Sequence, residues 1–132
     1  MEPAIETTGR EVLERILDAT ERHDIEALRP LMHHQIVGEW PQSGERFTGP
    51  DNAIGAMTAT DQKPDVAGEP RIIGEGDTWV LMVPLRYGTD PYHYVGVFEL
   101  DGGRLRHVTE YFGAPFEAQE ARAPFADRPP PG

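Results

Sequence analysis

The chain has 132 residues, a length that fits one domain with one hydrophobic core. Its 23 acidic and 12 basic residues give a net charge of −11, which argues against nucleic acid and anionic membrane as partners, because binding to either begins with a basic patch. Cysteine is absent, which excludes a disulfide and a thiolate metal site. No apolar run approaches the roughly 20 residues of a membrane span, and the N-terminus lacks a signal-peptide pattern, so we expect a cytoplasmic protein.

Helical spacing dominates the first third of the chain. Thr8 begins a helix, with Glu11 three residues later in the spacing of a capping box. One apolar stripe should be buried along this helix, formed by Val12, Leu13, Ile16, Leu17 and Thr20. Asp24 fits the N-cap of a second, short helix, and Pro30 inside it predicts a kink or an early end. The second helix should bury Ile25, Leu28, Leu31 and Met32.

A third helix follows after a turn. The adjacent His33 and His34 lead into a short extended piece over residues 35–40, which a turn at Pro41 ends. Pro50 lies near the first position of the third helix, which should run over residues 51–60. The polar residues after it, 61–68, predict a loop.

From residue 69 onward the apolar spacing changes to the alternation of strands. We expect strands over residues 71–75, 78–87, 92–100 and 103–112, joined by tight turns rich in Gly and Asp. The strand over 78–87 is apolar on both faces and should therefore be central. Pro84 within it lacks an N–H group, so it should lie at a bulge or where a ladder bond is absent.

The last strand carries the most informative alternation. It places Arg106, Val108, Glu110 and Phe112 on one face, and Leu105, His107, Thr109 and Tyr111 on the other. The carboxylate of Glu110 therefore lies between two apolar side chains. In a pocket, desolvation would raise its pKa and make it a candidate for proton transfer. The alternative is a structural carboxylate that pairs with Arg86 or Arg106.

A block of helices followed by antiparallel hairpins predicts an α+β fold. Three N-terminal helices should pack on a strongly curved, mostly antiparallel sheet, and this curvature would enclose a cavity at the open end. A bulge at Pro84 would add to the curvature. We expect one domain over residues 1–125 and a mobile, proline-rich tail over residues 126–132.

Four segments share their order and spacing with a known family. They are RHDIEAL at 22–28, EWPQSGE at 39–45 followed by Gly49, GVFELDGGRL at 96–105 and EYF at 110–112. Together they resemble the nuclear transport factor 2-like superfamily in its SnoaL-like branch, over nearly the whole chain. The resemblance implies a cone-shaped α+β barrel, often a homodimer, with a ligand cavity between sheet and helices.

Single positions narrow the chemistry that this resemblance implies. Trp40 and Ile16 stand where ketosteroid isomerases have their base Asp and oxyanion Tyr, so that activity is not expected. Glu110 fills the last-strand acid position of the limonene-epoxide hydrolases. Val83 and Leu85 stand where those enzymes have an Arg and a second Asp, which argues against water activation by that constellation.

The local sequence is most similar to that of the phenazine-biosynthesis A/B proteins. Residues 92–103 and 110–116 run parallel to theirs, and in that family the last-strand Glu is an acid/base group. Its His partner on the third helix has no counterpart here, near Ala56. This resemblance therefore implies a pocket with one carboxyl group and without the partner residue.

The candidate site combines these observations. Glu110 is the predicted acid/base group, and His33 is a second candidate proton carrier at the cavity rim. The predicted substrate-binding residues are Trp40, Tyr87, Tyr94, Val108 and Phe112. The plainer alternatives are a core tryptophan, structural tyrosines at strand ends and a solvated loop histidine. The five histidines lack the spacing of metal ligands, and we expect neither metal nor cofactor.

Two functions fit the sequence. The first is a cofactor-independent isomerase, cyclase, dehydratase or condensing enzyme that acts on a small apolar molecule. The second is a non-catalytic ligand-binding or dimerisation module of the same fold. A protein–protein adaptor is disfavoured, because no peptide-binding surface is recognisable. Val80, Met82 and Val95 would be exposed on the outer face of the sheet, so we expect a homodimer through that face.

Overall fold

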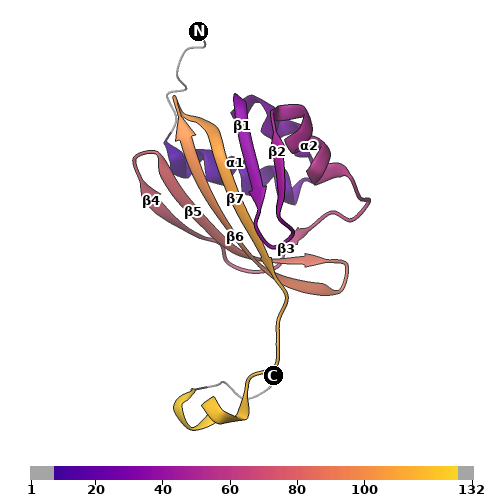
Figure 1. The fold of residues 1–132 in the computed structure, drawn as a ribbon, viewed down its shortest axis with the longest axis vertical. Coiled ribbons are helices and arrows are strands. Elements are labelled where there is room, and N and C mark those ends of the chain that lie inside the picture. The colour runs from indigo at the N-terminus through magenta and orange to yellow at the C-terminus, as the bar shows by residue number, and fades with distance from the viewer. Residues whose placement is uncertain (1–7, 128–132) are drawn as a thin grey trace.

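The computed structural model describes residues 8–127, in which helices pack against one side of a single sheet (Figure 1). Helices α1 and α2, two short 3₁₀ helices (η1 and η2) and seven strands follow one another along the chain. In chain order they are α1 (Gly9–Glu21), η1 (Ile25–Leu31), β1 (Met32–Trp40), β2 (Glu45–Thr48), α2 (Pro50–Thr58), β3 (Asp65–Val66), β4 (Arg71–Glu75), β5 (Thr78–Tyr87), β6 (Asp90–Asp101), β7 (Arg104–Gly113) and η2 (Glu120–Phe125).

The three predicted N-terminal helices are present, and one differs in kind. The Thr8 hydroxyl accepts a hydrogen bond from the Glu11 N–H at 3.2 Å, which confirms the predicted cap of α1. The second helix is a 3₁₀ helix with Pro30 inside it. Asp24 is the N-cap residue of this helix, as predicted, but its side chain makes no capping hydrogen bond, and its carboxylate lies 3.4 Å from Arg22 instead.

The seven strands form one mixed sheet in the order β2-β1-β7-β6-β5-β3, with β4 also paired to β5. Only β1 and β7 run parallel, and the other pairs are antiparallel. The α+β class with N-terminal helices and a mixed, curved sheet is confirmed, whereas strong curvature stays a prediction. The sequence analysis missed β2 altogether and read β3 as loop. It also began β1 too late, since His33 and His34 already belong to that strand.

Irregular pairing occurs where the sequence did not predict it. Pro84 pairs with His93 in regular register, so the first expectation, a bulge, is wrong, and the second, a position without a ladder bond to the neighbouring strand β6, is the one that applies. The Pro84 carbonyl accepts a hydrogen bond from the Ala67 N–H at 2.9 Å, just beyond the end of β3. In an antiparallel strand the N–H and C=O groups of one residue point to the same side, so the N–H that proline lacks would also point toward β3. No hydrogen bond to β6 is therefore lost. The bulge lies instead at Arg106, the residue left over between the pairs Glu99–His107 and Leu100–Leu105.

The core fills the space between the helices and the inner face of the sheet. Val12 and Leu13 of α1 are fully buried, and Leu81 of β5 is 2% exposed. Because side chains alternate along a strand, the inner face of β5 is Leu81, Val83 and Leu85, all buried. This packing leaves room beside the buried side chains, and that room forms the cavity described below.

The chain leaves the sheet after Gly113, and all of residues 114–127 are exposed, as Figure 1 shows for η2. Phe116 and Phe125 are 87% and 89% exposed. The domain boundary predicted at residue 125 stays a prediction, and residues 128–132 of the predicted tail lie outside the described residues. Among residues 8–127, no helix is long and apolar enough to cross a membrane.

Candidate functional site: a cavity with one carboxyl group

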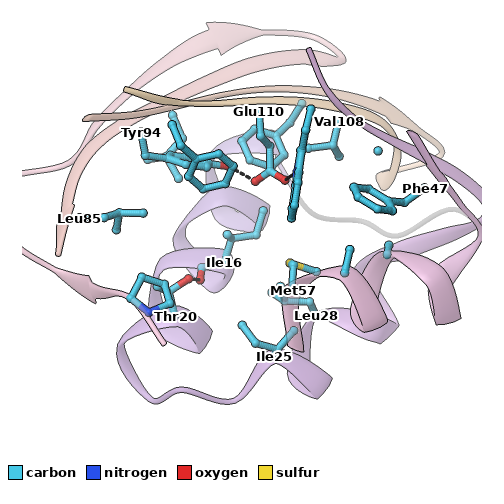
Figure 2. A pocket seen from close by; sticks show the side chains of 18 of the residues that line it. Ile16, Thr20, Ile25, Leu28, Phe47, Met57, Leu85, Tyr94, Val108 and Glu110 are labelled. Carbon is cyan, nitrogen blue, oxygen red and sulfur yellow. Dashed lines mark hydrogen bonds between the residues drawn. The ribbon is translucent and has the colours of Figure 1, made fainter. Parts of the chain in front are cut away.

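A cavity of about 440 Å³ lies between the inner face of the sheet and the helices. In Figure 2 the strands lie above it, with Tyr94, Glu110 and Val108 pointing in, while Ile16, Ile25 and Met57 rise from the helical side. This size is within the usual range for a site that takes a small organic molecule, roughly 300–1,000 Å³. The cavity is therefore the candidate site.

The cavity wall is mostly apolar. Among the residues that line it, the ones with a polar or ionisable group are few: Thr20, Trp40, Thr60, Gln62, Tyr87, Tyr92, Tyr94 and Glu110. Among the described residues that line the cavity, Glu110 is the only one with a carboxyl group, and none is a lysine, arginine or histidine. An anionic ligand would thus find no countercharge within this wall.

Two neutral side chains hold the Glu110 carboxyl group in place. Strand β7 lies between β1 and β6, so residues from both neighbouring strands reach it. The Trp40 indole N–H of β1 donates to Oε1 at 3.1 Å, and the Tyr94 hydroxyl of β6 hydrogen-bonds to Oε2, as the dashed lines in Figure 2 show. The carboxyl group is therefore fixed from two sides while it borders the cavity.

Burial governs the electrostatics of this group. It raises the pKa of Glu110 above its ordinary value of 4.5, although the hydrogen bonds from Tyr94 and Trp40 lower it in part. Within residues 8–127 no cation pairs with this carboxyl group. Arg106, one of the two expected structural partners, donates to the Gln35 carbonyl at 2.6 Å instead. The structural alternative of a surface ion pair at Glu110 is thus wrong.

The tyrosines of the site respond to the same environment. Burial, and then the charge of Glu110, raise the pKa of Tyr94 well above its ordinary value. Burial, Glu110 and Tyr92 together raise the pKa of Tyr87 to about 12. The ring of Tyr87 meets that of Tyr92 edge-on at 5.4 Å, and no hydrogen bond within the described chain occupies its hydroxyl group. Both tyrosines therefore stay protonated near neutral pH, and the Tyr87 hydroxyl can bind a ligand.

The structure brings together six of the seven predicted site residues. Trp40, Tyr87, Tyr94, Val108, Glu110 and Phe112 all line the cavity. His33 does not, because β1 turns its side chain away from the inner face. Its Nδ1 accepts from the Gln35 N–H at 2.9 Å, and its Nε2 lies 3.8 Å from Asp101, the last residue of β6. The placement of His33 at the cavity rim is thus wrong.

The sequence analysis missed two residues of the site on β6. Tyr92 lines the cavity two residues before Tyr94, and the alternation that selected Tyr94 places Tyr92 on the same face. Gly96 pairs with Glu110 across the strands, and a Cβ atom there would lie 2.5 Å from the Tyr94 hydroxyl oxygen. Only a residue without a side chain leaves that hydroxyl room to reach Glu110, and no pattern in the sequence announces this contact.

The chemistry available is proton transfer. Among the described residues, no group of three or more His, Cys, Asp or Glu side chains is placed to hold a metal ion. A carboxyl group whose pKa is raised in an apolar cavity is a better candidate for giving and taking a proton than a solvated carboxylate.

Comparison with known proteins places this fold and cavity in a family. Residues 13–108 match the SnoaL-like domain, and the chain belongs to this family. A solved NTF-2 like protein of unknown function from Burkholderia xenovorans LB400 is 32% identical, with a TM-score of 0.80 over 92% of this chain and 94% of that chain. No curated protein matches the chain.

Two further solved structures share the fold at lower identity. A Kribbella flavida DSM 17836 protein, provisionally named a ketosteroid isomerase, is 20% identical with a TM-score of 0.81, over 92% of this chain and 90% of that chain. An LEH-like epoxide hydrolase from M. tuberculosis is 20% identical with a TM-score of 0.61, over 77% of this chain and 80% of that chain. Such likeness shows the fold alone. The similarity to the phenazine-biosynthesis proteins stays a prediction.

Proposed function

We propose that the chain is a cofactor-independent acid/base enzyme that acts on a small, largely apolar organic molecule inside the cavity. The reaction would be an isomerisation, cyclisation, dehydration or condensation. One observation carries the proposal: among the described lining residues the only carboxyl group is half-buried in an apolar wall, is held by Trp40 and Tyr94, and has a raised pKa.

Each part of the wall has a role in this proposal. Glu110 exchanges the proton, because burial raises its pKa and so makes its neutral form more accessible than that of a solvated carboxyl group. Trp40 and Tyr94 fix the carboxyl group and stabilise its ionised form. Val108 and Phe112, two positions to either side of Glu110 on β7, exclude water from it. The Tyr87 hydroxyl orients a polar group of the substrate.

The positions that hold catalytic residues in two related enzyme classes carry uncharged side chains here. Trp40 and Ile16 both line the cavity at the positions where ketosteroid isomerases have their Asp and Tyr. Val83 and Leu85, which stand for the Arg and second Asp of the limonene-epoxide hydrolases, contribute only apolar surface. The proposed reaction therefore needs one carboxyl group and no second charged residue.

The second candidate is a non-catalytic ligand-binding module. It is favoured by the lack of a second proton carrier with an ordinary pKa near 7 among the residues that line the cavity. In that case Glu110 serves only as a hydrogen-bond partner for the ligand. The two candidates differ in turnover and agree in binding, so one experiment separates them.

The experiment measures proton exchange at C6, the saturated α-carbon of 2-cyclohexen-1-one, in D₂O by NMR. Glu110→Gln keeps the size of the side chain, and the amide can still accept from Trp40 and donate to Tyr94. An enzyme accelerates exchange, and the variant loses at least about tenfold of that acceleration. Glu99→Gln, on the outer face, is the matched control. Binding without acceleration by the wild-type protein favours the second candidate, as does a Glu110 pKa at its ordinary value of 4.5.

The outer face of the sheet supports a further part of the proposal, a homodimer. Val80, Met82 and Val95 are only half-buried there, and beside them Ile73 and Tyr111 are 45% and 41% exposed. The pairs Ile73–Val80, Met82–Val95 and Val95–Tyr111 make these residues neighbours on one surface. Sedimentation of Met82→Glu tests it: a dimer dissociates, whereas a wild-type protein that is already monomeric contradicts the dimer.

A further inference from the structure

The two oxygens of Glu110 have neighbours with different chemistry. Oε1 accepts from the Trp40 indole, a group that can only donate. Oε2 contacts the Tyr94 hydroxyl, which can either donate or accept. When Glu110 takes up a proton, that proton therefore belongs on Oε2, because on Oε1 it would compete with the indole N–H.

The protonation of Glu110 decides what Tyr94 does. While Glu110 is ionised, both oxygens accept, and Tyr94 gives its hydrogen to Oε2. Once Oε2 carries a proton, that O–H donates to the Tyr94 oxygen, and the phenolic hydrogen turns to another acceptor. Tyr94 lines the cavity, so the acceptor within its reach there is a bound molecule.

We propose that Tyr94, and not the carboxyl group itself, hands the proton to the ligand. In the step, the O–H bond of Glu110 breaks and its proton moves to the Tyr94 oxygen, while the phenolic O–H bond breaks and that proton bonds to the ligand. The ligand gains one proton, Glu110 becomes a carboxylate, and Tyr94 is unchanged; proton abstraction runs the same path in reverse. This relay rests on the proposed function and makes Tyr94 the catalytic residue that touches the substrate.

Gly96 makes this geometry accessible and is therefore a positioning residue. It lies directly opposite Glu110 in the β6–β7 pairing. A Cβ atom at this position would come within 2.5 Å of the Tyr94 hydroxyl oxygen and 2.6 Å of the Phe98 ring. The Tyr94 hydroxyl group thus occupies the space that a side chain at position 96 would take.

Few other ionisable groups can disturb the relay. The ones that line the cavity with Glu110 and Tyr94 are Tyr87 from β5 and Tyr92 from β6. The lining residues of α1, η1, α2, β1 and β2 contribute none. Protonation of Glu110 is thus the event that switches Tyr94 between its two roles.

Infrared spectroscopy of bound 2-cyclohexen-1-one tests the relay without turnover. In the wild-type protein below the pKa of Glu110, the carbonyl accepts from Tyr94 and its stretch moves to lower frequency; above that pKa the shift disappears. Tyr94→Phe removes only the hydroxyl group and should lose the shift at both pH values. Tyr111→Phe, on the outer face, should match the wild-type protein. A low-pH shift that persists in Tyr94→Phe means that Glu110 donates directly and overturns the relay, as does a wild-type spectrum without any shift.

A second measurement needs no ligand and remains available if Tyr94→Phe does not fold. Tyrosine labelled with ¹³C at Cζ is followed through the Glu110 titration. Tyr87 senses the charge of Glu110 without a hydrogen bond to it, so its resonance calibrates the effect of charge alone. The Tyr94 resonance should move with the same midpoint and further than that of Tyr87; an equal or smaller change overturns the relay. If the two hydrogen-bond roles of Tyr94 exchange but 2-cyclohexen-1-one shows no accelerated proton exchange, the proposed function is contradicted, whereas the hydrogen-bond switch between Glu110 and Tyr94 stands.

Discussion

The two faces of β7 carry carboxylate sites that differ in almost every respect. On the inner face, Glu110 is held by two neutral donors, Trp40 and Tyr94, at the wall of an apolar cavity. On the outer face, His107 lies between two carboxylates, 2.6 Å from Glu99 and 3.5 Å from Glu39. The outer three side chains are 35%, 51% and 36% exposed, in that order.

The comparison teaches that surroundings, and not residue type, decide which carboxylate can do chemistry. Water and salt screen the outer charges, so their pairing contributes little. The inner carboxyl group lies in an apolar wall, where desolvation raises its pKa. Residues only three positions apart on one strand, His107 and Glu110, thus belong to a surface network and to a candidate active site.

The largest expected loss of stability comes from a substitution on the inner face of β6, and it can be compared with one on the outer face. Phe98 of β6 faces the core and is 2% exposed, while its neighbour Val97 faces outward and is half-buried. Phe98→Ala should lower the unfolding free energy by about 3–5 kcal/mol, because it removes a buried ring and leaves a cavity. Val97→Ala should cost about 1 kcal/mol, since less apolar surface is lost. Urea unfolding measures both, and equal losses would show that the inner face is not the core.

The next largest effect concerns the position of Tyr94 in the inner site. Gly96→Ala puts a methyl group 2.5 Å from the Tyr94 hydroxyl oxygen, so the ring must move. We expect a loss of about 1–3 kcal/mol from overpacking, and a changed Glu110 titration midpoint because its contact with Tyr94 is lost. Gly38→Ala is the matched control, since its nearest neighbour, Phe47, lies 4.0 Å away. If both variants have the wild-type titration midpoint, Gly96 does not position Tyr94.

How much of these two sites the sequence could predict depends on whether a feature follows from neighbouring residues or from contacts between distant strands. The alternation around Glu110 is local, and it correctly gave the inner positions of Val108, Glu110 and Phe112. The same alternation failed at Leu105, which lines the cavity with Val108, because the bulge at Arg106 shifts the register by one residue. The bulge depends on pairing with β6, which a single strand does not encode.

The other errors have a similar cause. The residue type of His33 suggested a proton carrier, but its direction follows from where β1 begins and from its irregular parallel pairing with β7. Strand β2 is short and mostly exposed, so it has no apolar alternation to detect. The hydrogen bond from Trp40 to Glu110 joins residues 70 apart in sequence. Such contacts follow from the sheet topology rather than from any local pattern.

The third prediction concerns pH and the inner carboxyl group. Its pKa lies above 4.5 in the folded protein, so between 4.5 and the raised value the folded state binds a proton that the unfolded chain has released. Rising pH therefore lowers the unfolding free energy across this window, by at most about 1.4 kcal/mol per pH unit for one proton. Glu110→Gln removes this dependence. Urea unfolding of both proteins from pH 4 to pH 8 checks it, and parallel pH profiles would show that burial does not raise the pKa.

The smallest expected change in stability comes from a substitution on the outer face. His107→Gln removes a partly exposed side chain whose two nitrogens face Glu99 and Glu39. We expect the unfolding free energy to change by less than about 0.5–1 kcal/mol, and the difference to shrink further in 1 M salt, because exposed ion pairs are weak and screened. Arg46 already faces Glu39 at 3.7 Å and can partly replace the lost contact. A larger loss that persists in high salt would mean that the outer network is shielded from water, which a partner subunit seated on this face would explain.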